Sequence, residues 1–79
     1  MNNSLFALKL LPIGKEATVR ELAIQGAIRR RMLDLGLIPG TQVEALHKSP
    51  SGDPIAYGIR GAVIAIRSEE TSKIFVSMY

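Results

Sequence analysis

Twelve residues near the middle of the chain, at positions 29–40, constrain its fold more than any other stretch. Ile28, Met32 and Leu35 are spaced four and then three residues apart, so they lie on one side of a helix. This apolar stripe predicts one substantial α-helix over residues 26–35. It also predicts that the three stripe residues face the core.

Glycine and proline residues mark both ends of this helix. Gly26 is an acceptable N-cap residue, so we expect the helix to begin near it. Gly36 directly follows the stripe, where a residue with positive φ commonly ends a helix. Pro39 fixes φ and Gly40 permits positive φ, so the pair predicts a turn into the next strand.

Short apolar or alternating runs, separated by turn residues, surround the helix and predict β-strands. The expected strands are residues 5–11, 17–24, 42–48, 55–59, 62–66 and 74–79. Five to six short strands with one inserted helix predict a mainly-β protein, folded as a small closed or nearly closed barrel in a single domain, 1–79.

Two of these segments have further features. Val19 is out of phase with Leu22 and Ile24 in the strand at 17–24. Residues 62–66 are apolar on both faces, which predicts the most buried strand of the barrel.

A short helical turn is expected over residues 68–72. Ser68 is its expected N-cap, because two acidic residues follow it and acids are favoured in a first helical turn.

Turn chemistry assigns structural roles to residues in two further connections. Gly52, Asp53 and Pro54 belong to a loop at 49–54 that is rich in serine, proline and glycine. Gly61 follows Arg60 between two strands and predicts a tight hairpin.

Composition excludes several classes of function. The 79 residues include no cysteine, so disulfides, thiolate metal sites and cysteine nucleophiles are absent. The N-terminus lacks the features of a signal peptide, and no apolar run is long enough to cross a membrane. We therefore expect a cytoplasmic protein. Its net charge of +3 leans only slightly toward anionic partners.

The chain carries no arrangement of residues that predicts catalysis, a metal site or a cofactor. His47 is the only histidine and has no neighbouring ligands in sequence. Glu69 and Glu70 have a structural role, because acidic side chains are favoured in the first turn of a helix. The glycines match no nucleotide-binding pattern. We predict that the protein is not an enzyme.

Arg29, Arg30 and Leu33 form the one candidate binding patch in the sequence. They lie together on the helix, away from the Ile28–Met32–Leu35 stripe. Two interpretations fit: a solvated helix face with one exposed leucine, or a partner-binding patch that combines donors with an apolar anchor.

Several segments together resemble one known family. They are residues 30–41, the loop at 49–54, Ile59-Arg60-Gly61, and Ala65-Ile66-Arg67, in this order and at these spacings. The chain resembles the FeoA family, the ferrous iron transport protein A family of bacteria and archaea. The resemblance implies an SH3-like β-barrel with an inserted helix. It also implies a cytoplasmic partner of FeoB, the membrane iron transporter that carries a G-protein domain.

Two alternative functions accompany this expectation. The basic charge and Arg29–Arg31 fit a small nucleic-acid-binding barrel, although the aromatic content of 5% offers few stacking surfaces for bases. The other alternative is a stand-alone relative of the C-terminal domain of iron-dependent repressors. No helix-turn-helix precedes the expected barrel, which disfavours the repressor alternative.

Overall fold

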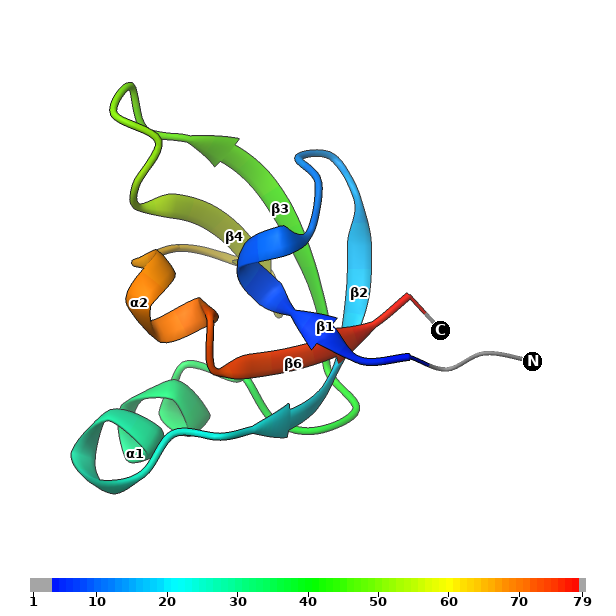
Figure 1. The fold of residues 1–79 in the computed structure, drawn as a ribbon, viewed down its shortest axis with the longest axis vertical. Coiled ribbons are helices and arrows are strands. Elements are labelled where there is room, and N and C mark those ends of the chain that lie inside the picture. The colour runs from blue at the N-terminus through cyan, green and yellow to red at the C-terminus, as the bar shows by residue number, and fades with distance from the viewer. Residues whose placement is uncertain (1–3, 79) are drawn as a thin grey trace.

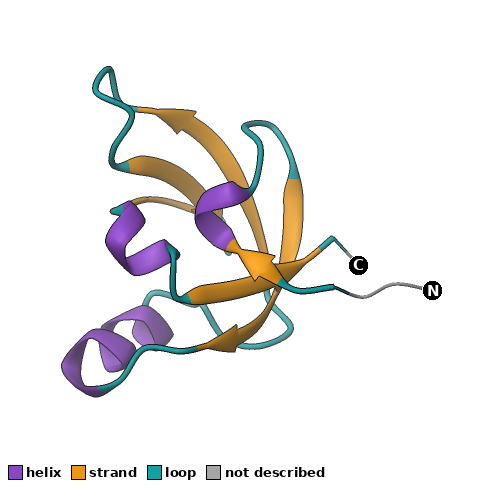
Figure 2. Ribbon diagram, viewed as in Figure 1, coloured by secondary structure: helices purple, strands orange, loops and turns teal. Residues whose placement is uncertain are grey.

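The computed structural model describes residues 4–78. The elements in chain order are β1 (Phe6–Ala7), the 3-10 helix η1 (Leu8–Leu10), β2 (Glu16–Leu22), α1 (Gly26–Asp34), β3 (Gln42–Lys48), β4 (Ile55–Ile59), β5 (Ala62–Ile66), α2 (Ser68–Thr71) and β6 (Ile74–Ser77). All strand pairs are antiparallel, in the order β1-β6-β2-β3-β4-β5. Figures 1 and 2 show this sheet curling around a common interior, with α1 at one end. The mainly-β class and the inserted helix are confirmed.

One hydrophobic core fills the interior of the curled sheet, and every strand from β2 to β6 contributes side chains to it. Its fully buried members include Val19, Val43, Tyr57, Ile66 and Val76. The two helical elements η1 and α1 also contribute to this core, since Leu8 of η1 and Met32 of α1 are both completely buried in it. A chain this small depends on sharing one core among all its elements.

The end of α1 follows the glycine signal in the sequence. Gly36 has a φ of 106°, its N–H donates to the Leu33 carbonyl, and the Leu37 N–H donates to the Met32 carbonyl, both at 3.0 Å. These two bonds form a Schellman motif, which satisfies carbonyls at the helix end. Met32 and Leu37, the two residues it brings together, are both fully buried.

The Pro39–Gly40 turn is also present. Gly40 has a φ of 98°, and the Thr41 N–H donates to the Ile38 carbonyl at 2.9 Å. Proline followed by a glycine of positive φ is typical of a type II turn.

Irregular pairing explains the phase of Val19. The register of β2 against β6 shifts between Val19 and Glu21, so Arg20 is an extra residue on its strand. Such a bulge shifts the alternation of inward and outward side chains by one residue. Val19 and Leu22 therefore both face the core, although three positions separate them.

Several expected elements were wrong in detail. Residues 5–11 form the two-residue β1 and then η1, because Leu8 turns into the core where a strand would have continued. The N-cap residue of α1 is Gln25 and that of α2 is Arg67, one residue before Gly26 and Ser68. The last strand ends at Ser77, and residue 79 lies outside the described residues, as do residues 1–3.

The expectation for residues 62–66 was wrong in a more consequential way. This segment, β5, is an edge strand, and among the described residues it pairs only with β4. Val63 is 68% exposed, and Ala62 and Ala65 are also exposed. Apolar composition on both faces predicted burial, but the curled sheet buries only its inner face, so the outer face of β5 with Val63 and Ala65 lies in solvent.

Candidate partner-binding surfaces

Arg29 is tied to the backbone that precedes its helix. Its Nη1 donates to the Leu22 carbonyl at 2.7 Å and to the Ile24 carbonyl at 3.4 Å. Leu22 ends β2, and Ile24 lies in the connection to α1. The guanidinium therefore anchors the start of α1 to the sheet.

Leu33 is half-buried and packs against the hydrophobic core. Ile28, expected in the core, is instead 45% exposed. The reason is the position of the helix: the core residues of α1 lie in its C-terminal part, while its N-terminal part projects from the end of the sheet (Figure 1). The face of α1 that packs on the core therefore includes Leu33 in addition to Met32, and it does not include Ile28.

Arg30 and Arg31 differ in their surroundings. Arg31 Nη2 lies 3.3 Å from Glu70 Oε1, an ion pair that links α1 to α2. Arg30 is exposed and makes no hydrogen bond or ion pair with another described residue. Of the predicted patch of Arg29, Arg30 and Leu33, only Arg30 is both exposed and without a partner among the described residues. A role for the patch in partner binding stays a prediction.

A small hollow of about 180 Å³ lies between α1 and α2. Its lining residues are Ile24, Ile28, Glu69, Glu70 and Lys73. The exposed side chain of Ile28 forms its apolar side, and the charged residues come from α2 and the turn after it.

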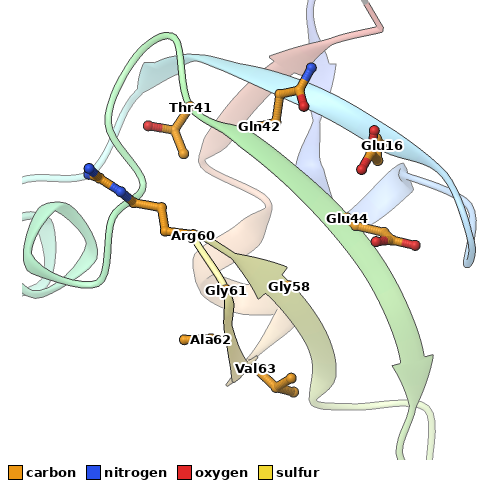
Figure 3. Close-up of a pocket in the computed structure, with 9 residues that line it drawn as sticks. All are labelled: Glu16, Thr41, Gln42, Glu44, Gly58, Arg60, Gly61, Ala62 and Val63. Atoms are coloured by element: carbon orange, nitrogen blue, oxygen red, sulfur yellow. The ribbon is translucent and has the colours of Figure 1, made fainter.

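A larger groove, of about 560 Å³, crosses the outer face of the sheet (Figure 3). It is lined by Glu16, Thr41, Gln42, Glu44, Gly58, Arg60, Gly61, Ala62 and Val63. The residues come from β2, β3, β4, β5 and the turns between them. Strand pairing places Glu16 opposite Glu44, Glu44 opposite Gly58, and Gly58 opposite Val63, so these four form a row across the sheet.

The groove has a charged end and an apolar end. Glu16 and Glu44 are directly opposed, and neither forms an ion pair within residues 4–78. Figure 3 shows the Arg60 side chain extending away from both carboxylates. It lies instead against Gly36, where a Cβ would come within 2.9 Å of the Arg60 Cδ. Val63 provides the apolar end.

No pattern in the sequence indicated this groove. The alternation of β3 places Glu44 on a sheet face, and this signal was visible in the sequence. The pairing of Glu44 with Glu16 was not, because α1 and its flanking turns separate the two strands. The Arg60–Gly61 hairpin, in contrast, forms as predicted: φ is 51° at Arg60 and 84° at Gly61, typical of a type I′ turn.

The loop at 49–54 positions Asp53 for two contacts. Its Oδ1 accepts a hydrogen bond from the Ser68 N–H at 2.8 Å, and its Oδ2 lies 3.9 Å from Arg67 Nη1. Gly52 has a φ of 91°, and the bond between Asp53 and Pro54 is cis. Asp53 thus caps α2 from another part of the chain, a role that its loop position alone did not indicate.

Two further polar residues of the described chain are the exposed His47 and the buried Tyr57. His47 is exposed on β3, and the histidine, aspartate and glutamate residues among positions 4–78 form no group of three able to hold a metal ion. The Tyr57 hydroxyl is buried without a hydrogen-bond partner among the described residues. Desolvation raises the pKa of Tyr57 above its ordinary value of 10.0; the Thr71 side chain offsets part of this rise, and the negative charge of Asp53 adds to it.

Within the described part of the chain, no helix combines the length and the apolar character that a membrane crossing requires.

Comparison with known proteins assigns the family. A family model described as the FeoA domain matches residues 6–78. The chain belongs to the FeoA domain family. The FeoA protein from Chlorobium tepidum has the same fold, with a TM-score of 0.86 and 36% identity, covering 91% of this chain and 69% of that one.

Two further relatives extend the comparison. The zinc complex of FeoA from Stenotrophomonas maltophilia is described as an SH3 domain protein; it has a TM-score of 0.77 and 29% identity, covering 91% of this chain and 89% of that one. This agrees with the SH3-like barrel expected from the sequence. A fusion of Fe(2+) transport protein A with the Fe(2+) transporter FeoB, from Porphyromonas gingivalis, is 28% identical over 71 residues. That match covers 90% of this chain but only 8% of the relative.

Proposed function

We propose that this FeoA-family protein acts in ferrous iron transport as an accessory module. In this proposal it lies in the cytoplasm, binds the cytoplasmic region of a FeoB-type transporter, and catalyses no reaction itself. One observation carries the proposal: in the Porphyromonas gingivalis relative, a FeoA-like segment and FeoB are parts of one chain. Fusion into one chain holds two modules at a high effective concentration, which favours an interaction between them.

The surfaces described above are consistent with docking. The groove across the sheet combines an apolar end with uncompensated carboxylates, and the α1 surface adds the free Arg30. Partner surfaces commonly combine apolar anchors with charged groups that orient the partner.

A binding measurement with purified components tests the proposal. The cytoplasmic region of the FeoB-type transporter from the same organism is immobilised, and this protein is passed over it without nucleotide, with GDP and with a GTP analogue. We expect saturable binding in at least one nucleotide state. An absence of binding in all three, together with normal ferrous iron uptake in a strain that lacks this protein, would rule the proposal out.

A salt titration against a DNA or RNA oligonucleotide separates the nucleic-acid alternative. Binding through phosphate contacts weakens steeply and linearly on a logarithmic scale as salt rises. We expect no such binding.

A further inference from the structure

We propose that the groove across the outer face of β2–β5 binds an extended segment of a partner protein that carries one apolar and one basic side chain. The apolar side chain packs on Val63, and a lysine or arginine side chain enters between Glu16 and Glu44. This inference rests on the proposed function in one respect, since the partner is taken to be the transporter.

The row of four residues sets the length of the segment. Neighbouring strands lie about 4.8 Å apart, so the row from Val63 through Gly58 and Glu44 to Glu16 extends about 14 Å. An extended chain rises about 3.3 Å per residue, and alternate side chains point the same way. That distance corresponds to about four residues of extended chain, so the apolar and basic residues of the partner lie four positions apart.

The charged end favours a cation. Like charges directly opposite on neighbouring strands are destabilising, and neither carboxylate forms an ion pair with a described residue, since Arg60 lies against Gly36 instead. The protein as a whole carries a net charge of +3, so this acidic pair is a local exception. A basic side chain between the two carboxylates would form charge-assisted hydrogen bonds with both.

The apolar end is open to a chain that enters from the side. Gly58, opposite Val63, has no side chain of its own, and the Leu46 side chain lies beside it, 3.5 Å from where a Cβ would stand. No described element pairs with the outer edge of β5. The two-residue hairpin makes Ile59 and Ala62 a hydrogen-bonded pair, so the backbone groups of Val63 point away from β4. A partner segment can therefore reach Val63 without displacing any described residue.

Peptide binding followed by NMR tests the chemistry of the groove directly. The probes are two capped heptapeptides, Gly-Val-Ser-Thr-Ser-Arg-Gly and its reverse, and versions of both with glutamate in place of arginine. With at least one arginine peptide we expect amide shifts concentrated at Glu44, Gly58 and Val63, and with the glutamate peptides none. Absent shifts, shifts elsewhere, or equal effects of both kinds of peptide would overturn the proposal.

The double variant E16Q/E44Q separates binding from structure. It removes both charges at nearly constant shape, so we expect the Kd for the arginine peptide to rise about tenfold and Tm to rise by a few degrees as the repulsion disappears. Purely structural carboxylates would instead give a lower Tm and unchanged binding. Glu21→Gln is the matched control, because Glu21 is an exposed glutamate on β2 outside the groove.

A second variant examines the apolar end. Val63→Lys places a competing cation in the groove, and because Val63 is 68% exposed we expect an unchanged fold with at least fivefold weaker binding. Leu10→Lys is the control, since Leu10 is 63% exposed and lies outside the groove. Binding unchanged in Val63→Lys would contradict the proposal.

The transporter region, tested with the same variants, distinguishes the two proposals. If that region binds and both groove variants leave its Kd within twofold, the groove is not the docking surface and the proposed function stands. If the arginine peptides bind but the transporter region does not, and uptake is normal in a strain that lacks this protein, the ligand chemistry of the groove is supported and the proposed function fails. Shifts at the same amides that depend on protein concentration alone would show that a second copy of this chain occupies the groove, which overturns the proposal.

Discussion

The carboxylate of Asp53 caps the backbone N–H of Ser68 at 2.8 Å, although fifteen residues separate them in the sequence. The contact joins the loop before β4 to the first turn of α2. A short helix with no side-chain cap of its own thus receives one from a distant loop.

We expect Asp53→Ala to lower the free energy of unfolding by about 1 kcal/mol, the usual cost of losing an N-cap. Asp53→Asn keeps an acceptor oxygen and should recover most of this loss, because the ion pair with Arg67 is largely exposed and contributes little. Urea denaturation of both variants measures the difference. An exposed control, Asp34→Ala, should change stability far less, and an equal loss in Asp53→Asn would contradict the capping role.

Gly36→Ala should be among the most damaging glycine substitutions in the chain. The new Cβ would combine a φ of 106° with contacts of 2.9 Å to Arg60 Cδ and 3.1 Å to Ile59 Cγ2. Gly40→Ala has a similar φ of 98° but open space around its Cβ, so it isolates the backbone cost of about 1–2 kcal/mol. We expect Gly36→Ala to cost roughly 1 kcal/mol more.

A double-mutant cycle with Arg60→Ala checks whether the Arg60 side chain causes the additional destabilisation expected for Gly36→Ala. Shortening Arg60 removes the nearer contact, so part of the excess should disappear in the double variant. Strict additivity of the two changes would show that the Arg60 side chain is not responsible.

The buried hydroxyl of Tyr57 should make the folded protein less stable at high pH. Burial holds the pKa of its hydroxyl above 10.0 in the folded state, so the folded state keeps a proton that the unfolded state releases. This contribution is fully present below pH 10 and is lost as pH rises through the raised pKa. Chemical denaturation at several pH values up to 11 should show stability falling above about pH 10.

Tyr57→Phe should remove that pH dependence. The hydroxyl makes no hydrogen bond to another described residue, although the nearby Thr71 side chain offsets part of the rise in its pKa. At neutral pH we therefore expect the variant to be as stable as the natural protein, or more stable by up to about 1 kcal/mol. A loss of more than that would reveal a hydrogen bond to Tyr57 and refute this account.

Arg29 and Arg30 should behave differently despite being neighbours. Arg29→Ala removes the donor to the Leu22 and Ile24 carbonyls, so we expect a loss of about 1 kcal/mol. Arg30→Ala should stay within about 0.5 kcal/mol, as usual for an exposed side chain. Thermal melts of the two variants provide the comparison, and equal losses would contradict it.

Arg30→Glu is accordingly the variant that tests the α1 surface in transporter binding. If that surface docks the partner, charge reversal should weaken binding while Tm stays unchanged. Leu33→Asp is less informative, because Leu33 packs against the core and a charge there would destabilise the fold.

The local elements of the fold were predictable from particular residues. Gly36, Pro39–Gly40 and Arg60–Gly61 each produced the turn or helix end that their φ preferences indicated. The alternation of Ile55, Tyr57 and Ile59 correctly placed all three in the core. The candidate site was harder to predict: α1 was found, but Arg29 and Leu33 proved to be engaged within the fold.

Residues near each other in the chain determined where this protein turns, where its helix stops and which family it resembles, because φ preferences and side-chain alternation act over a few residues. Only the tertiary structure decided that β5 lies at an edge with Val63 exposed, that Glu16 faces Glu44, and that Asp53 caps α2. Strand order and register depend on contacts between segments far apart in the chain, and no local pattern records which strand will have a neighbour.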